Sequence, residues 1–244
     1  MSDIKAKWIA ADWGTTHMRA WAIGEEDNVL AFRESNEGMK DLQQNEFEPV
    51  LLRLIESWLD DTKVTTVMAC GMVGAKQGWV ETPYLKTPCV PIDNNQLTTA
   101  NTNDQRIKVH LVPGVMQNHP ADIMRGEETQ IAGFINKNTN FKGVVCLPGT
   151  HAKWVNINEG QITSFKTFMT GELFGVISNH TLIRHSTSIK GWDQESFEEG
   201  VHDGFKNPGL IASNLFSLRA ESIVNNLDRD QARSTLSGLL LGVE

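Results

Sequence analysis

Residues 8–21 read Trp8-Ile9-Ala10-Ala11-Asp12-Trp13-Gly14-Thr15-Thr16-His17-Met18-Arg19-Ala20-Trp21. An apolar run ends in an acid, a Gly-Thr-Thr turn follows, and a second run begins at Met18. This pattern predicts two β-strands joined by a tight turn. The glycine would let the backbone approach a bound anion, and the threonines would add hydroxyl donors. Taken alone, the stretch could equally be a plain hairpin turn capped by its Asp and Thr side chains.

A weaker copy of the pattern lies downstream and reads Val144-Val145-Cys146-Leu147-Pro148-Gly149-Thr150-His151-Ala152-Lys153-Trp154-Val155. Both copies carry Gly-Thr, then His, a basic residue and Trp. The presence of two such turns favours phosphate binding over a plain hairpin. We expect them to contact the phosphates of one nucleotide through Gly14, Thr15, Thr16, Gly149 and Thr150.

The spacing of the two copies indicates duplicated domains, because it far exceeds the roughly 20–50 residues of a solenoid repeat. Each copy continues in the order strand, turn, strand, strand, helix. This order predicts an α/β fold of two ribonuclease-H-like lobes with a central cleft. The polar, apolar-poor segment 136–140 marks the expected boundary, with an N-terminal lobe at residues 1–138 and a C-terminal lobe at 139–244.

Hydrophobic periodicity and turn residues predict the individual elements. Strands are expected at residues 8–12, 18–23, 29–33, 65–69, 107–112, 144–147, 153–157 and 162–165. Helices are expected from residue 48 onward and at residues 126–135, 171–183, 193–204, 208–218 and 229–241.

Composition narrows the class of protein. The chain has 244 residues, 40% of them hydrophobic, and a formal net charge of −8 with no basic tract, which argues against a nucleic-acid partner. No uninterrupted apolar run reaches the roughly 18 residues of a membrane span, and no signal peptide is evident. Three scattered cysteines suit the reducing cytoplasm, with Cys70 and Cys146 expected to be buried small hydrophobes.

Several acidic and basic residues could carry chemistry. Asp12 ends an apolar strand beside the first turn, where its carboxylate could hold Mg²⁺ directly or through water. Lys153 could face a phosphate or be an exposed strand residue, and the sequence leaves both alternatives open. Glu127 begins a predicted helix, where an acid is ordinary first-turn charge or a general base that orients a hydroxyl.

Two glycine-containing segments are also ambiguous. Gly71-Met72-Val73-Gly74 suits close helix packing, a hinge or a wall of a substrate site. Met169-Thr170-Gly171-Glu172 is either a helix cap with Thr170 at the cap position or a ligand contact. The sequence has no P-loop, no Gly-x-Gly-x-x-Gly, no His-Glu-x-x-His and no Gly-x-Ser-x-Gly motif.

With these residues in hand, the chain resembles the 2-dehydro-3-deoxygalactonokinase family along nearly its whole length. The wider fold is shared by actin, sugar kinases and heat-shock chaperones. The resemblance is carried by Asp12-Trp13-Gly14-Thr15-Thr16, Gly71-Met72-Val73-Gly74, Met124-Arg125-Gly126-Glu127-Glu128-Thr129-Gln130, Leu147-Pro148-Gly149-Thr150-His151-Ala152-Lys153-Trp154, Met169-Thr170-Gly171-Glu172-Leu173 and Leu236-Ser237-Gly238-Leu239-Leu240-Leu241-Gly242.

The resemblance implies transfer of phosphate from ATP, with Mg²⁺, to the terminal hydroxyl of 2-dehydro-3-deoxygalactonate in galactonate breakdown. Related carbohydrate kinases have a Gly-Asp pair at a helix start that supplies the base, and Gly126-Glu127 stands in that place here. Glu127 is therefore the expected catalytic base. Lys153 joins the expected phosphate contacts, and Arg125, Gly71, Met72 and Glu172 are further candidates for contact with the sugar acid.

One departure from the family pattern bears on function. Family members continue beyond the Leu236–Gly242 segment into a strand and a Gly-rich helix start that hold adenine. The second lobe is therefore expected to be incomplete at its C-terminal side, and the alternative function is a non-catalytic sugar-acid or nucleotide-binding remnant. Apolar residues at the end of the last helix, Leu239, Leu240, Leu241 and Val243, are expected to be exposed, and a homodimer could cover them.

Overall fold

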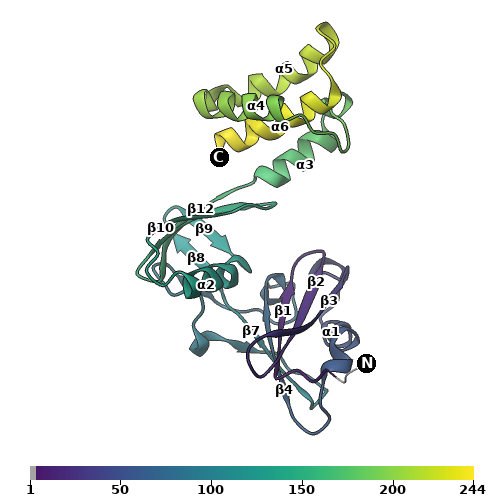
Figure 1. Cartoon of the computed structure of the whole chain (residues 1–244), viewed down its shortest axis with the longest axis vertical. Helices are drawn as coiled ribbons and strands as arrows, with labels where there is room; N and C mark the ends of the chain where they lie inside the picture. Colours follow the sequence, from purple (N-terminus) through teal and green to yellow (C-terminus); the bar gives the residue numbers. More distant parts are fainter. Residues whose placement is uncertain (1–3) are drawn as a thin grey trace. The chain divides into compact units, whose positions relative to one another are not determined.

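The computed structural model describes residues 4–244, and the chain divides into two compact units (Figure 1). The first unit takes in the described residues up to Val145 together with Val155–Phe165. The second unit comprises Cys146–Trp154 and Lys166–Glu244. Sheets and helices are both abundant, so the α/β class expected from the sequence is confirmed.

The regular elements follow the chain in a simple order. The strands are β1 (Trp8–Trp13), β2 (Met18–Ile23), β3 (Val29–Ser35), β4 (Thr65–Cys70), β5 (Tyr84–Lys86), β6 (Thr98–Thr99), β7 (Ile107–Leu111), β8 (Gly114–Asn118), β9 (Ala121–Met124), β10 (Gly143–Leu147), β11 (Ala152–Asn158) and β12 (Gln161–Phe168). The α-helices are α1 (Phe47–Ile55), α2 (Glu127–Lys137), α3 (Thr170–His180), α4 (Gln194–Lys206), α5 (Ile211–Val224) and α6 (Arg229–Val243). Every strand and helix expected from the sequence is present, with ends shifted by a few residues.

A six-stranded sheet with the order β3-β2-β1-β4-β7-β6 forms the body of the first unit. β1, β2 and β3 run antiparallel, whereas β4 and β7 continue the sheet parallel to β1. The register places Asp12 of β1 between Arg19 of β2 and Cys70 of β4. The carboxyl ends of β1 and β4 therefore meet at one edge of the sheet.

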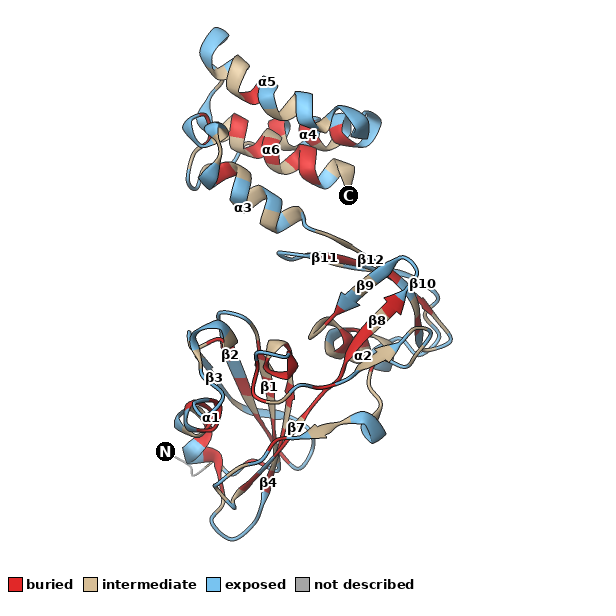
Figure 2. Ribbon diagram, turned by 180° about the vertical axis from the view of Figure 1, so that it is seen from behind, coloured by how far each residue is buried: buried red, intermediate tan, exposed pale blue. Residues whose placement is uncertain are grey.

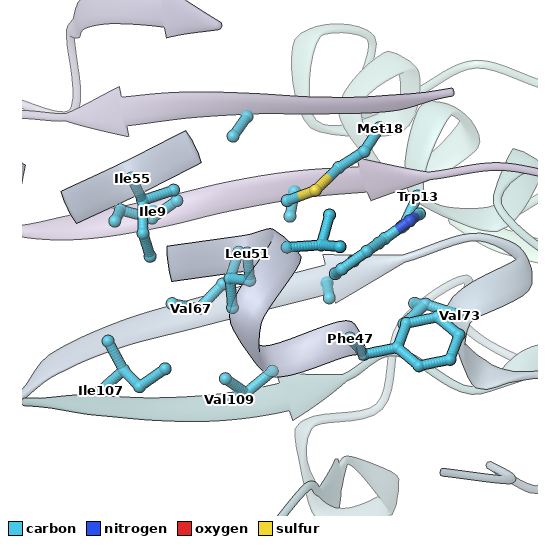
Figure 3. Packing of buried hydrophobic residues seen from close by; sticks show 14 of the residues in the cluster. Ile9, Trp13, Met18, Phe47, Leu51, Ile55, Val67, Val73, Ile107 and Val109 are labelled. Carbon is cyan, nitrogen blue, oxygen red and sulfur yellow. The ribbon is translucent and has the colours of Figure 1, made fainter. Parts of the chain in front are cut away.

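Alternation along β1 builds the core beneath this edge. Ile9, Ala11 and Trp13 are buried on one face, while Trp8, Ala10 and Asp12 are only half-buried on the other. The buried face packs against α1, whose apolar residues recur at helical spacing (Figure 3). The rings of Trp13 and Phe47 lie 5.1 Å apart, and the indole N–H of Trp13 donates to the carbonyl of Glu37 at 3.0 Å. This packing fixes the end of β1 next to the first turn.

A second sheet of three strands has the order β5-β8-β9, and the sequence did not predict it. β8 begins at Gly114, directly after Pro113, where Pro-Gly indicates a turn that ends a strand. β8 and β9 pair antiparallel, and β9 ends one residue before Arg125. This hairpin leads directly into the start of α2.

The third sheet has the order β10-β11-β12, and its strands run through both units. β11 and β12 are joined at Glu159 and Gly160, which both have positive φ (51° and 73°). Two such residues form the type I′ turn that suits a two-residue hairpin. The sequence predicted both of these strands, although not this turn type.

The helical part of the second unit is held together by α4 and α6, whose glycines allow the two backbones to touch. A Cβ atom built on Gly200 would lie 3.2 Å from the Cα atom of Gly238. One built on Gly204 would lie 3.1 Å from the Cα atom of Gly242. Buried residues accordingly follow α6 along the face that meets α4 (Figure 2).

Two expectations about exposure are wrong. At the end of α6, Leu239 and Leu240 are buried (2% and 7% exposed), because α6 packs closely against α4 and α5. Only Leu241 is substantially exposed (42%), so little apolar surface is left for a homodimer to cover at this point. Cys146 is also exposed rather than buried, because alternate residues of β10 are exposed.

Within residues 4–244, no helix combines the length and the apolar character needed to cross a bilayer.

Candidate active site

The first turn, Gly14 to Thr16, is held from behind by the segment that follows β3. The amide of Met39 donates to the carbonyl of Gly14 at 3.0 Å, and that of Lys40 donates to the carbonyl of Thr15 at 3.1 Å. Gly38 makes this contact possible, because a Cβ atom there would lie 2.3 Å from the Thr15 carbonyl oxygen. The carbonyl oxygens of Gly14 and Thr15 are thereby occupied.

The opposite side of the first turn presents hydrogen-bond donors. Thr15 and Thr16 are exposed, and their amides donate to no backbone carbonyl of residues 4–244. The Thr16 hydroxyl lies 2.7 Å from Nδ1 of His17. A short exposed turn with unpaired amides and exposed hydroxyl side chains is the arrangement that binds an anion such as phosphate.

Asp12 stands beside this turn in an environment that disfavours its charge. Its side chain is 37% exposed, and Oδ2 lies 3.7 Å from Nη1 of Arg19. Partial burial raises the pKa of the Asp12 carboxyl, and the nearby Arg19 guanidinium opposes that shift. A cation bound at Asp12 would stabilise the charged carboxylate.

Two glycines bring the start of α2 to the same edge of the sheet. Gly71 follows β4 with φ of +92°, and a Cβ atom there would lie 3.3 Å from Oδ1 of Asp12. Gly126 precedes α2 with φ of +109°, and its Cβ atom would lie 3.3 Å from the Cα atom of Gly71. The carboxyl ends of parallel strands and a helix N-terminus thus converge next to Asp12, as in ligand sites of many α/β sheets.

The two acids that open α2 have different environments. Oε2 of Glu127 accepts a hydrogen bond from the Arg125 amide at 3.0 Å, and the residue is half-buried. Glu128 is fully buried, and its Oε2 accepts from the Gly126 amide at 2.6 Å. Burial raises the pKa of Glu128 to about 7. Of the two carboxylates, only that of Glu127 is accessible to a substrate.

Arg125 is fixed by a set of contacts that the sequence could not reveal. Its Nη1 donates to the hydroxyl of Thr82, its Nη2 donates to the Thr82 carbonyl at 3.1 Å, and its Cζ lies 4.3 Å from the ring centre of Tyr84. Gly74 leaves room for this guanidinium, because a Cβ atom there would lie 2.9 Å from Nη1. Arg125 Nε is buried and has no hydrogen-bond partner within residues 4–244. Such a buried donor without a partner is rare in proteins.

A cavity of about 520 Å³ adjoins Asp12 within the first unit. Most of its walls are apolar, and they include Trp8, Trp21 and Met68 from the sheet and Ile92 beyond it. Asp12 and Arg19, together with Thr129 and Gln130 of α2, lie among its polar lining. The polar groups of a bound ligand would face this polar lining, because buried polar groups need hydrogen-bond partners.

The structure also places the other first-unit candidates. Gly71 is buried, and Met72 is half-buried in the 3-10 segment Met72–Gly74. Cys70 lies beneath the site near Asp12 and Glu128, and burial raises the pKa of its thiol to about 12, so it is inert. Within residues 4–244, no group of three or more His, Cys, Asp or Glu side chains forms a candidate metal cluster. A metal ion at this site would therefore be coordinated by Asp12 and by oxygen atoms of a bound ligand.

The second turn, Gly149 and Thr150, lies in the second unit and is tied to the start of α3. The Glu172 amide donates to the Thr150 carbonyl at 3.0 Å, and Glu172 Oε2 lies 2.5 Å from Nε2 of His151. A Cβ atom on Gly171 would lie 2.6 Å from the carbonyl oxygen of Gly149. Glycine at this position therefore lets the helix start touch the turn.

The structure also shows where the remaining candidate residues of the second unit lie. Lys153 is buried in β11 and is not an exposed strand residue. The capping role considered for Thr170 is wrong: Met169 occupies the cap position, and the Thr170 hydroxyl donates to Oε2 of Glu244 at 2.5 Å. Gly149 and Thr150 are exposed, so a phosphate group could reach them.

Known proteins similar to this chain share one description. The family model for 2-keto-3-deoxy-galactonokinase matches residues 12–244. The probable 2-dehydro-3-deoxygalactonokinase DgoK1 of Rhizobium meliloti (strain 1021) is 37% identical over 243 residues, which are 97% of this chain and 78% of that protein. The 2-dehydro-3-deoxygalactonokinase of Escherichia coli (strain K12) is 35% identical over 242 residues, 98% of this chain and 79% of that protein.

A solved structure agrees with these matches. The crystal structure of a Sinorhizobium meliloti protein assigned as a 2-dehydro-3-deoxygalactonokinase matches this chain with a TM-score of 0.88 at 36% identity. The match covers 97% of this chain and 78% of that one. The resemblance drawn from the motifs is confirmed: the chain belongs to the 2-keto-3-deoxy-galactonokinase family.

Proposed function

We propose that this protein transfers the γ-phosphoryl group of ATP to the terminal hydroxyl of 2-dehydro-3-deoxygalactonate. Family membership supports the reaction. The structural observation that carries it is the convergence of Asp12, Gly71 and Gly126 at one edge of the sheet. This convergence sets a carboxylate, a phosphate-binding turn and a helix N-terminus side by side, which are the parts that phosphoryl transfer needs.

Glu127 acts as the general base in this proposal. A base must lie within hydrogen-bond reach of the hydroxyl and must be ionised when the reaction occurs. The hydrogen bond from the Arg125 amide to Glu127 Oε2 fixes the direction of the carboxylate. Glu128 does not serve as the base because it is fully buried.

Asp12 and the two turns hold the nucleotide in this proposal. Mg²⁺ commonly binds through one or two carboxylates together with the substrate phosphates, and a half-buried Asp12 fits that mode. A bound Mg²⁺ would neutralise charge on the phosphates. The open amides of Thr15 and Thr16, next to Gly14, cradle phosphate oxygens in this proposal, and Gly149, Thr150 and Lys153 are proposed as further phosphate contacts.

Arg125 binds the carboxylate of the sugar acid in this proposal. Its guanidinium is already oriented by Thr82 and Tyr84, so little rotamer entropy is lost on binding. Gly71 and Met72 form the adjoining wall, and Glu172 is a further candidate contact on the second unit.

The arrangement of the whole molecule is part of the proposal. Three antiparallel strands followed by two parallel ones in the larger sheet support a ribonuclease-H-like first lobe. We propose lobes at residues 1–138 and 139–244 that enclose a central cleft, in a protein that works in the cytoplasm. Closure of such a cleft would exclude water, which otherwise competes with the sugar hydroxyl.

A coupled assay of ADP release tests the proposed function. The wild-type chain is mixed with ATP, Mg²⁺ and 2-dehydro-3-deoxygalactonate, and the same mixture is run with Asp12→Asn and with Asp61→Asn, an exposed acid of the same unit. We expect turnover for the wild type and Asp61→Asn, and strong loss for Asp12→Asn. Binding of either substrate without turnover by the wild type would contradict the kinase assignment and favour a non-catalytic binding protein.

A further inference from the structure

A second cavity, of about 460 Å³, lies wholly within the helical unit and away from the residues assigned above. It is formed by α3, by the 3-10 segment Leu182–His185 and the loop after it, and by the first turns of α6. Arg184, Arg229 and Arg233 all line it, and no Asp or Glu does. We call it the arginine cavity.

The three guanidinium groups are positioned by neutral partners. Arg229 Nη2 donates to the carbonyl of Thr187 at 2.9 Å, and Arg233 Nη1 donates to the carbonyl of Ser188 at 3.3 Å. Arg233 Cζ also lies 4.8 Å from the ring centre of Phe174. Within residues 4–244, none of the three arginines forms an ion pair with a carboxylate.

The acids nearest in sequence are engaged elsewhere. Oδ1 of Asp228 accepts the amide of Asp230 at 2.8 Å and so caps α6. Asp193 caps α4 in the same way, through the Ser196 amide at 2.8 Å. The side chain of Asp230 occupies the space next to Gly191, outside the cavity lining. Three positive charges therefore gather around one hollow in a chain whose net charge is −8.

We propose that the arginine cavity binds the phosphate group of a small molecule. Arginine offers a planar fork of donors that matches phosphate oxygens, and three such forks around one cavity suit a doubly charged group better than a single carboxylate. The hydroxyl of Ser188 and the amide of Asn179 add neutral polar groups to the lining. His185 Nε2 accepts a hydrogen bond from Arg184 Nε at 3.3 Å.

This site is separate from the second turn. Glu172, which contacts Thr150, is outside the cavity lining, although Phe174 and Gly175, which follow it closely on α3, belong to that lining. The cavity and the proposed kinase site share no residue, so either proposal could fail while the other remains valid.

Calorimetric titration of the full-length protein with inorganic phosphate, at constant ionic strength, tests the proposal. We expect saturable binding that the double variant Arg229→Gln/Arg233→Gln weakens at least tenfold. Lys190→Gln also removes one positive charge, but from an exposed loop residue outside the lining. This control is expected to leave the phosphate affinity unchanged. Titration with glycerol 3-phosphate then asks whether the cavity accepts a phosphate ester or only the free ion, and acetate is expected not to compete.

Two further variants keep the test decisive. Arg184→Gln alters an exposed arginine whose described contact is His185 alone, so the fold is expected to survive, and we expect severalfold weaker phosphate binding. Thr15→Val/Thr150→Val weakens both phosphate turns and is expected to retain the binding that the arginine variants lose. Equal phosphate affinity in the wild type and Arg184→Gln, or loss only in the threonine variant, would overturn the proposal.

Discussion

Gly71 and Gly126 lie so close together that a Cβ atom built on Gly126 would stand 3.3 Å from the Cα atom of Gly71. Both residues have positive φ, in a region that other residues adopt at a cost. This contact seats the first turn of α2 against the end of β4, beside Asp12. The spacing between the proposed metal-binding acid and the proposed base depends on it.

Replacing Gly126 by Ala is expected to impair catalysis and stability together. The positive φ of +109° alone costs about 1–3 kcal/mol for a residue with a side chain, and the methyl group also presses on Gly71. We expect a lower urea midpoint and a fall in kcat of at least tenfold. Gly133→Ala, in the middle of α2 with nothing within 4 Å, serves as the control and should retain full activity.

The stability of the first unit is expected to depend on pH through Glu128. Burial raises the pKa of this carboxyl from 4.5 to about 7 in the folded state. The folded protein therefore holds a proton that the unfolded chain has released between these two pH values, so stability falls as the pH rises through this window. At about 1.4 kcal/mol per pKa unit, the loss above pH 7 is about 3 kcal/mol.

Glu128→Gln tests this assignment, because glutamine keeps the shape and cannot ionise. Urea unfolding at pH 5 and pH 8 should show a smaller decrease in stability for the variant than for the wild type. Glu195→Gln, in the first turn of α4, should behave as the wild type does. Parallel pH profiles for the wild type and Glu128→Gln would show that Glu128 titrates as an ordinary exposed acid.

The close packing of α4 and α6 predicts a strong position dependence for glycine substitutions in the second unit. A Cβ atom on Gly238 would lie 2.2 Å from the carbonyl oxygen of Phe197, so Gly238→Ala forces the helices apart and should cost about 1–3 kcal/mol. Gly175 in α3 has nothing within 4 Å, and Gly175→Ala should gain up to about 1 kcal/mol from helix propensity. Thermal unfolding of both variants measures the difference. Equal effects would mean that the two helices are not in backbone contact.

Arg125→Lys is expected to weaken binding of the sugar acid while sparing the chemical step. A lysine cannot contact both Thr82 atoms, stack on Tyr84 and still present a forked donor to a carboxylate. Loss of one charged hydrogen bond costs about 1.5–3 kcal/mol, so KM for the sugar acid should rise tenfold or more. Steady-state kinetics with ATP saturating should show kcat within a few-fold of the wild type. Arg53→Lys, an exposed arginine of α1 paired with Glu37, is the control.

The sequence was most informative where structure is determined locally. The alternating runs at residues 8–12 and 18–23, the helical spacing after Glu48 and the glycine before Glu127 led to β1, β2, α1 and α2. The strands β8 and β9 were missed, because Pro113-Gly114 is typical of a turn and these short strands lack strong alternation.

The candidate site could be predicted only in part, because its contacts join residues far apart in the chain. Asp12 and the helix start at Glu127 were identified from motifs. The approach of Gly71 to Gly126 and the hold of Thr82 on Arg125 depend on tertiary packing that no local pattern records. The same reason explains why the burial of Leu239 and Leu240 was missed, since it requires the glycines of α4.

The kinetics of Glu127→Gln test the assignment of the catalytic base most directly. Glutamine preserves the size of the side chain and its acceptor for the Arg125 amide, and it removes only the ability to take up a proton. With ATP, Mg²⁺ and 2-dehydro-3-deoxygalactonate, we expect kcat to fall by about 10²–10⁴-fold while the dissociation constant of the sugar acid stays within a few-fold of the wild type. Near-normal turnover by Glu127→Gln would contradict the account and remove this residue from the mechanism.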